Sequence, residues 1–371
     1  MRTVTLLLAS VLMVSGCSAR PEAPDAQSGE NDRADSSADN LRPAHHKADG
    51  TFVNTDGTAI SKSFTDLLRW RWTRTEPEAL PFPVLKPDPA KLQNPDSPQI
   101  TWIGHSAFLL QVGGKNILTD PHFTERASPL SFLGPERVVE SPLTVEELPH
   151  IDAIVISHNH YDHLDEKTIR LLDEKQKHNP PLYFVPLGLK KELNGYDIEE
   201  VIEMDWWETH EFSGMQFTAL PVKHWSQRNF FDRNETLWAG WLVDIGEFRF
   251  FHTGDSGYSS DFAKIGEDYP GIDLATIPIG AYDPRWFMKD AHMSPEEAAQ
   301  VFIDLKAEKA IGMHWGTFIL TDEEMDEPPV RLRAALKKNN IRVTDFSVMK
   351  HGEVLRVIIG QSPEAISDIS D

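Results

Sequence analysis

The chain of 371 residues carries 36 Lys and Arg against 58 Asp and Glu, which gives a formal net charge of −22. This balance excludes a protein that binds nucleic acid over a wide surface, because such binding depends on neutralising phosphates with basic side chains. Any recognition of phosphate must therefore be local. The 40% of hydrophobic residues, with 10 Trp and 19 Phe, suffice for the core of one large domain or two closely packed halves.

The first residues have the features of an export signal. Arg2 precedes an apolar stretch, Val4–Val14, that is too short to span a bilayer but typical of a signal peptide over residues 1–16. The sequence VSGC at residues 14–17 resembles the bacterial lipobox, which implies cleavage before Cys17 and lipidation of this residue. An ordinary signal peptide with an incidental cysteine is the alternative. Ser18 after the cysteine favours the outer membrane, facing the periplasm, by resemblance to bacterial sorting rules.

Cys17 is the only cysteine of the chain. An intramolecular disulfide is therefore impossible, and no thiolate is left to bind a metal or to act as a nucleophile in the folded domain.

Polar segments flank the predicted domain. Residues 17–50 are rich in Asp, Ser, Ala, Pro, Asn and Glu, which predicts a disordered acidic tether. We interpret His45 and His46, an adjacent pair in this tract, as incidental rather than as a metal site. Residues 51–360 form the predicted domain, and residues 361–371 form a polar tail.

Within the domain, short apolar runs alternate with Gly, Pro and Asp, which predicts many strands with helices between them. Strands are expected at Gln99–Ile103, Ala107–Val112, Asn116–Leu118, Trp238–Ile245 and Phe248–Phe251. The first clear helix is predicted at residues 165–177. A second begins after Ser294, where Pro295 and Glu297 complete a capping box. The order predicts two sheets faced by helices.

The first candidate site residues form one dense cluster. The apolar run Ile154–Ser157 leads directly into His158, His160, Asp162 and His163. Imidazoles and carboxylates grouped beside an apolar strand cost free energy unless a cation pairs with them, so the spacing indicates a metal site. A polar loop of chance composition is the alternative.

Three later candidates, His224, Asp255 and His314, follow apolar runs in the same way. If these strands are neighbours, their C-terminal ends meet at one edge of the sheets. Taken singly, each histidine is more often a hydrogen-bonded core or rim residue, and Asp255 beside Gly254 can be a turn residue. Together with the first cluster, the three residues make seven ligands.

Seven ligands suit two metal ions. The expected sets are His158, His160 and His224 for the first ion and Asp162, His163 and His314 for the second, with Asp255 between them. Imidazole and carboxylate donors without thiolate favour zinc, and ligand type alone leaves manganese and iron open. Two such ions activate a shared water molecule, so we count Asp162 and Asp255 among the catalytic residues.

Longer motifs carry a family resemblance. SHNHYDHLD at residues 157–165 resembles the metallo-β-lactamase fold, an α/β four-layer αββα sandwich. Other motifs resemble N-acyl-phosphatidylethanolamine-hydrolysing phospholipase D: FVPLG (184–188), DWW (205–207), KHW (223–225), TGDSGY (253–258), IPIGAYDPRWFM (277–288), HMSPEEA (292–298) and MHWGTF (313–318). Opening elements also match, including FVN (52–54), LLRW (67–70), TWIGH (101–105) and LTDPHF (118–123). The resemblance therefore spans most of the predicted domain.

The resemblance implies a site of two zinc ions on the seven predicted ligands, and it suggests a homodimer. It also implies that Tyr161 and His292 contact the phospholipid head group. His292 would orient the phosphate or protonate the leaving alkoxide, whereas a helix-entry residue bonded to backbone is the alternative. For Tyr161 the alternative is a rim aromatic residue. His105 and His252 are expected to support the ligands rather than to bind metal.

Two further features bear on substrate contact. Ala291 stands where the family pattern has a polar amide, which leaves head-group selectivity open. Trp70, Trp72, Trp206 and Trp207 are expected in the core, and an interfacial patch is the alternative.

One main hypothesis and two alternatives follow. The main hypothesis is a lipid-anchored, zinc-dependent phospholipase D that cleaves a phosphodiester bond of an (N-acyl)phospholipid at a membrane surface. It would release phosphatidic acid and an N-acylethanolamine-like alcohol. A lactonase or soluble phosphodiesterase keeps the metals but changes the substrate, and a non-catalytic, metal-stabilised envelope protein is the third possibility. No nucleic-acid partner is expected.

Overall fold

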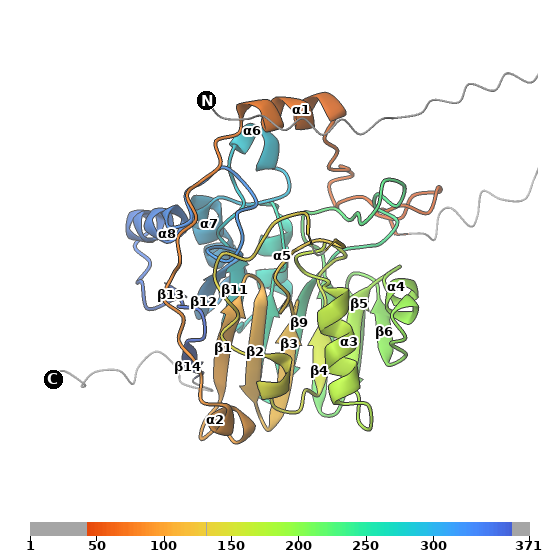
Figure 1. The fold of residues 1–371 in the computed structure, drawn as a ribbon, viewed down its shortest axis with the longest axis vertical. Helices are drawn as coiled ribbons and strands as arrows, with labels where there is room; N and C mark the ends of the chain where they lie inside the picture. The colour runs from red at the N-terminus through yellow and green to blue at the C-terminus, as the bar shows by residue number, and fades with distance from the viewer. Residues whose placement is uncertain (1–42, 131, 358–371) are drawn as a thin grey trace, which may run out of the picture. The chain divides into compact units, whose positions relative to one another are not determined.

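The computed structural model describes residues 43–130 and 132–357 (Figure 1). The predicted signal peptide, Cys17, most of the predicted tether and the polar tail lie outside the described residues.

Two sheets, each with seven strands among the described residues, form the centre of the domain. The strand order is β14-β1-β2-β3-β4-β5-β6 in the first sheet and β13-β12-β11-β10-β9-β8-β7 in the second. The first sheet consists of β1 (Gln99–Gly104), β2 (Ala107–Val112), β3 (Lys115–Thr119), β4 (Ala153–Val155), β5 (Leu182–Pro186), β6 (Val201–Met204) and β14 (Val354–Arg356). The second consists of β7 (Thr209–Phe212), β8 (Met215–Leu220), β9 (Gly240–Ile245), β10 (Phe248–His252), β11 (Leu274–Pro278), β12 (Lys309–Met313) and β13 (Phe346–Val348).

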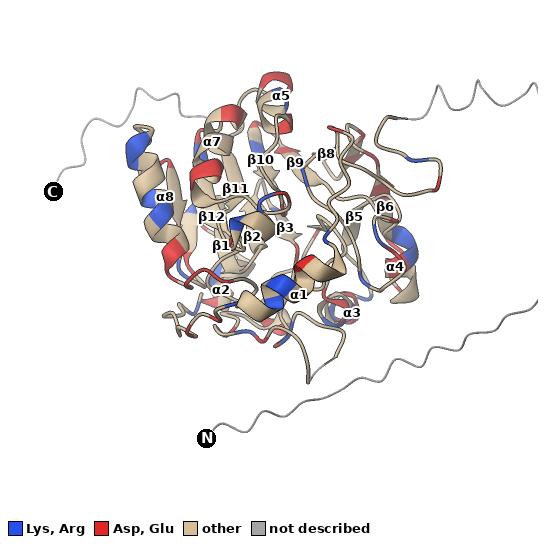
Figure 2. Ribbon diagram, turned by 90° about the horizontal axis from the view of Figure 1, so that it is seen from above, with Lys and Arg blue, Asp and Glu red and all other residues tan. Residues whose placement is uncertain are grey.

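Helices lie on both outer faces of the paired sheets, and α1 and α6 lie above one edge of them (Figure 1). The helices among the described residues are α1 (Phe64–Thr73), α2 (Pro89–Gln93), α3 (Glu166–Lys175), α4 (Lys190–Gly195), α5 (Asp261–Asp268), α6 (Arg285–Met288), α7 (Pro295–Leu305), α8 (Glu327–Lys338) and the short 3₁₀ helix η2 (Val145–Glu147). Figure 2 shows α5 and α7 on one side of the two sheets and α3 on the other. This arrangement confirms the predicted four-layer αββα sandwich.

Strand β2 shows why the sheets are buried on both faces. Phe108 and Leu110 point into the core between the sheets, while Leu109 joins the cluster that contains Ile169 of α3. Side chains alternate between the two faces of a strand, so a strand with a continuous apolar run can only lie between two layers.

The predicted strands at the start of the domain and around Gly246 are confirmed within a few residues. The capping box of α7 is also confirmed, because Ser294 and Glu297 cap each other's backbone N–H groups. Two helices, α1 and α2, precede the one predicted as first. Helix α1 buries none of its residues, so its sequence carries no apolar periodicity to reveal it.

The described part of the chain begins at Pro43 and so includes residues 43–50, which were predicted as part of the tether. His46 forms a β-bridge with Phe52, and the side chains of His45 and His46 bond to Asp205 at 2.7 Å. Residues 43–50 therefore pack on the domain rather than forming a disordered tether, and the histidine pair, interpreted as incidental, makes specific contacts with Asp205.

The core prediction for the four tryptophans is right only for Trp206, which is buried. Trp70 is half-buried and stacks on Phe287, whereas the Trp72 side chain is 91% exposed and Trp207 is partly exposed. Trp70 and Trp72 belong to α1, which lies on the surface. No helix of the described residues combines the length and the apolar character needed to cross a bilayer.

Candidate metal centre

The strands deliver the predicted ligands to one edge of the two sheets. Strands β3, β4 and β5 run parallel in the first sheet, as do β10, β11 and β12 in the second. Their C-terminal ends therefore share an edge. The sheets approach closely at Gly254, where an added Cβ would lie 2.4 Å from the Cβ of Ser157. A glycine is needed there for space and for its φ of +60°.

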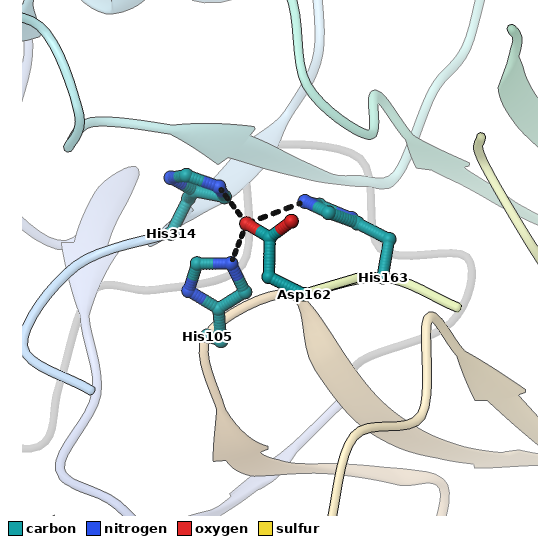
Figure 3. Close-up of side chains that lie close together, drawn as sticks. All are labelled: His105, Asp162, His163 and His314. Carbon is teal, nitrogen blue, oxygen red and sulfur yellow. Dashed lines mark hydrogen bonds and ion pairs between the residues drawn. The ribbon is translucent and has the colours of Figure 1, made fainter. Parts of the chain in front are cut away.

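One group of side chains gathers around Asp162 (Figure 3). Its Oδ2 lies 2.9 Å from Nε2 of His105, 3.4 Å from Nε2 of His314 and 3.6 Å from Nε2 of His163. The three rings converge on this carboxylate from different segments of the chain. His105, expected to support a ligand, is hydrogen-bonded to Asp162.

A second group consists of His158, His160 and His224. Nδ1 of His160 lies 2.7 Å from Nε2 of His158 and 3.3 Å from Nε2 of His224. Two ring nitrogens at such distances can share only one proton. A cation can bind all three nitrogens at once, so this group suits a metal ion better than a set of hydrogen bonds.

Asp255 lies between the two groups. Its Oδ2 is 3.0 Å from Nε2 of His314, 3.1 Å from Nε2 of His163 and 4.0 Å from Nε2 of His224. The structure thus brings all seven predicted ligands together, in the two groups that the sequence predicted.

Unpaired polar atoms show that the donor set fits metal ions. Nε2 of His163, Nε2 of His314 and Oδ1 of Asp255 are buried without a hydrogen-bond partner among the described residues. Each such atom costs about 1–3 kcal/mol unless something binds it. Imidazole nitrogens and carboxylate oxygens at this spacing are ligands for zinc and similar ions.

A buried carboxylate, Asp120, holds the site from behind. It accepts hydrogen bonds from the N–H and the hydroxyl of Ser157 at 2.7 Å, and its Oδ2 lies 2.7 Å from Nδ1 of His163 and 3.1 Å from Nε2 of His252. Burial disfavours the charged form of Asp120 and by itself raises its pKa. The imidazoles of His163 and His252 outweigh burial and hold the pKa of Asp120 well below its usual range. Asp120 therefore fixes the orientation of the His163 ring, as carboxylates bonded to the second nitrogen of a metal-binding histidine do.

Asp120 is not among the site residues predicted from the sequence. A usable signal was present, since Asp120 follows the apolar end of strand β3 just as the predicted ligands follow theirs. His252 is expected as a supporting residue, and both of its ring nitrogens are hydrogen-bonded. Nδ1 bonds to the hydroxyl of Thr276, and Nε2 bonds to Asp120.

The carboxylates divide the histidines into two classes. Burial opposes the charged forms of His163 and His314, but Asp255 and Asp162 outweigh it, so the pKa of His163 is well above its usual value and that of His314 is raised to about 9. Burial prevails at His160, His224 and His292, where it lowers the pKa to about 3.

His292 and Tyr161 lie at the rim of the centre. Nδ1 of His292 is 3.8 Å from Oδ2 of Asp255 and has no hydrogen-bond partner among the described residues. Tyr161 donates its hydroxyl to the carbonyl of Arg228, whose guanidinium lies over the Tyr161 ring at 4.0 Å. Both Tyr161 and Arg228 line a cavity of about 1600 Å³.

Fold and site together define a metal-dependent hydrolase. Residues 115–315 match the family model of the β-lactamase superfamily domain. The chain is 41% identical over 268 residues to N-acyl-phosphatidylethanolamine-hydrolyzing phospholipase D 1 of Caenorhabditis elegans, covering 68% of this chain and 74% of the relative. It is 37% identical to the mitochondrial enzyme of the same name from Saccharomyces cerevisiae, covering 62% of this chain and 50% of the relative.

Among solved structures, Igni18, a metallo hydrolase from Ignicoccus hospitalis, matches with a TM-score of 0.52 at 22% identity, over 70% of this chain and 97% of that chain. This likeness supports the fold. The chain belongs to the metallo-β-lactamase superfamily and, within it, to the family of N-acyl-phosphatidylethanolamine-hydrolysing phospholipase D.

The raised pKa values of His163 and His314 predict how metal binding depends on pH. Below about pH 6.5 both rings are protonated, which stabilises the metal-free fold; the contribution of His314 is lost as the pH rises through about 9, and that of His163 as the pH rises through its own raised pKa. A cation binds these nitrogens only after the proton leaves. We expect the affinity of the chelator-treated protein for zinc to rise with pH, by up to about tenfold per unit for each group.

Calorimetric titration with zinc between pH 6.5 and 9 measures this dependence. An affinity that is constant or falls over this range would contradict the assignment of the protonated nitrogens.

Proposed function

We propose that this protein is a metal-dependent phosphodiester hydrolase of the phospholipase D type, acting on an N-acylated phospholipid. One water is consumed, the phosphorus–oxygen bond to the alcohol breaks, and phosphatidic acid and an N-acylethanolamine-like alcohol are released. The observation that carries the proposal is the meeting of two donor groups at Asp255, in a chain 41% identical to a phospholipase D of this name.

The chain's own residues would hold two ions in the predicted sets. His158, His160 and His224 offer one set, Asp162, His163 and His314 offer the other, and Asp255 reaches both. Zinc suits these donors best, with manganese and iron as the other candidates. When bound, the ions would supply an activated water and offset the negative charge that develops on the phosphoryl oxygens.

His292 is suited to orient the phosphate. Burial lowers the pKa of His292 to about 3, so its ring is neutral near pH 7 and donates a hydrogen bond rather than a proton. Its side chain is partly accessible and lies beside Asp255. Of the two roles considered for His292, head-group binding therefore has the better support.

Helix α1 offers a surface for a lipid layer next to this residue. The exposed apolar side chains of Phe64 and Trp72 lie on α1, which packs on α6 through the contact of Trp70 with Phe287. The chain reaches His292 directly after α6, and the His292 N–H bonds to the carbonyl of the last α6 residue, Met288. Exposed apolar groups at the entrance of a site are expected where the substrate is part of a membrane.

The substitution Asp255→Asn tests the proposed activity. It removes the charge that both donor groups share, so we expect phosphodiester hydrolysis to fall by at least about 10³-fold, the scale of losing one essential group. Lipid mass spectrometry on a mixed phospholipid extract, with and without chelator, identifies the bond cleaved and the metal dependence.

A matched control is Asp268→Asn on the exposed end of α5, which should keep full activity. Full activity of Asp255→Asn would refute the role of this carboxylate. Turnover of a lactone or soluble phosphodiester in preference to lipid would favour the alternative hydrolases. Hydrolysis of none of these esters by the metal-loaded protein would favour a structural metal site.

The substitution His292→Gln separates the two roles of this residue. Gln keeps an N–H donor but cannot transfer a proton, so a phosphate-orienting role predicts that His292→Gln retains clearly more activity than His292→Ala. Steady-state rates of both variants on lipid micelles, from pH 6 to 9, give the comparison. Equal loss in both variants, with loss of the alkaline limb of the pH profile, would instead indicate an acid catalyst.

The double substitution Phe64→Ala/Trp72→Ala tests the lipid-facing surface. Each lost aromatic contact with the lipid weakens adsorption by about 1–2 kcal/mol, and the two together by about 2–4 kcal/mol, so we expect roughly 30- to 1000-fold lower turnover on vesicles at limiting lipid. Turnover of a short, soluble phosphodiester should not change. Val330→Ala/Val343→Ala, at exposed positions outside α1, is the matched control. Equal effects of both double variants would contradict a specific surface.

We further propose that Cys17 is lipidated and anchors the protein to the outer membrane, facing the periplasm, since the VSGC sequence follows a short apolar stretch. An anchor would keep the enzyme beside its substrate. Cys17→Ser should move the protein from the membrane to the soluble fraction of a bacterial host. The mass of the membrane-extracted wild-type chain, which must exceed that of residues 17–371 by the attached acyl groups, gives the direct check.

A further inference from the structure

A second meeting of metal-binding side chains lies in a part of the chain that shares no residue with the candidate centre. His45 and His46 come from the N-terminal segment, and Asp205 directly follows strand β6. Nε2 of His45 is 2.7 Å from Oδ1 of Asp205, and Nε2 of His46 is 2.7 Å from Oδ2. One ligand atom from each residue lies within 4.8 Å of the others.

The two imidazoles are disposed like the pairs of the candidate centre. The ring centroids of His45 and His46 are 4.5 Å apart with an angle of 74° between the planes. The corresponding values are 4.4 Å and 83° for His158 with His160, and 4.6 Å and 77° for His158 with His224. The two rings thus have the separation and angle of the pairs in the candidate centre, and each turns its Nε2 toward the carboxylate of Asp205.

Packing fixes the three side chains. The His45 ring stacks on Trp206 at 4.4 Å, and Phe52 meets the His46 ring edge-on at 5.1 Å. The carboxylate of Asp205 is further oriented by the N–H of Trp206, which bonds to Oδ1 at 2.7 Å. The side chains keep 10%, 22% and 14% exposure for His45, His46 and Asp205, so an ion could enter from solvent and little rotamer entropy would be lost on binding.

We propose that His45, His46 and Asp205 form a further site for one divalent transition-metal ion, with zinc as the best match. Two imidazoles and one carboxylate are a usual zinc donor set, and water would complete the coordination. Nε2 of His45 and Nε2 of His46, which face Asp205, would bind the ion, and the carboxylate would exchange its two contacts with these nitrogens for the ion.

An ion at this site would fasten the N-terminal segment to the first sheet. The same segment continues to Asn54, whose buried Oδ1 accepts hydrogen bonds from the backbone N–H of His224 at 3.0 Å and from the indole of Trp238 at 3.2 Å. Asp56 also pairs with Lys223 at 2.8 Å. Asn54 is thus a positioning residue for the loop of His224, and the further metal site would stabilise that loop at a distance.

Zinc titration of the chelator-treated full chain tests the site. Calorimetry and metal analysis after gel filtration should show one more equivalent of zinc in the wild type than in His46→Ala or Asp205→Asn. His178→Ala, at an exposed position of the α3 to β5 connection, should keep the wild-type number. Because the readout is a difference of one equivalent, it stays interpretable whether the candidate centre holds one ion or two.

Limited proteolysis supplies a readout that does not depend on stoichiometry. At free zinc ten times its dissociation constant for the extra equivalent, cleavage within residues 43–58 should slow by about tenfold in the wild type and not in His46→Ala. Equal zinc content in the wild type and in both variants, or protection that persists in His46→Ala, would overturn the proposal. Unchanged retention of the other equivalents shows that the variants are folded.

Discussion

At one carboxylate oxygen, Oδ2 of Asp255, four histidine nitrogens meet within 4.0 Å, and the side chains that carry three of them are fully buried. Three of these nitrogens, on His163, His292 and His314, have no hydrogen-bond partner among the described residues, which is unfavourable in a protein interior because each lacks the water that it would bind outside. Cations would remove this penalty and would also bind the carboxylates of Asp162 and Asp255. The arrangement of the whole edge of the sandwich follows from the need to hold these groups together.

The fold holds them by backbone conformations that are costly elsewhere. His105, Asp120 and His314 all have positive φ, between 35° and 60°, which is uncommon for residues with a Cβ and costs about 1–3 kcal/mol each. Each follows or ends a buried strand, so the ladders on either side impose the turn. The His314 N–H bonds to the carbonyl of His105 at 3.0 Å, which joins the second sheet to the first directly beneath the centre.

Local patterns predicted two sheets faced by helices and the residues that end the strands, while the resemblance to the metallo-β-lactamase fold implied the four-layer sandwich and the two-metal site. A continuous apolar run indicates a strand between two layers, and the residue types after β4, β8, β10 and β12 belong to metal sites. The sequence did not predict α1 or the exposure of Trp72, because a helix that buries nothing has no period to read. His45 and His46 were misjudged for a related reason: their partner, Asp205, is 159 or 160 positions away, and composition alone cannot show such a contact.

The net charge of −22 does not conflict with the proposed contact with phospholipid, because charge acts locally. At physiological ionic strength, exposed charges farther than about 8 Å from a surface are largely screened, so the side chains at the point of contact decide the interaction. Helix α1 carries Arg69 and Arg71 and one acidic residue, Asp66, and Arg74 caps its C-terminal end. Figure 2 shows basic residues on this helix. Basic and apolar side chains together favour an anionic lipid layer. Because a single weak attachment to a membrane is reversible, the proposed anchor at Cys17 and the proposed surface of α1 would act as two signals: the anchor would raise the local concentration, and α1 would turn the candidate metal centre toward the lipid.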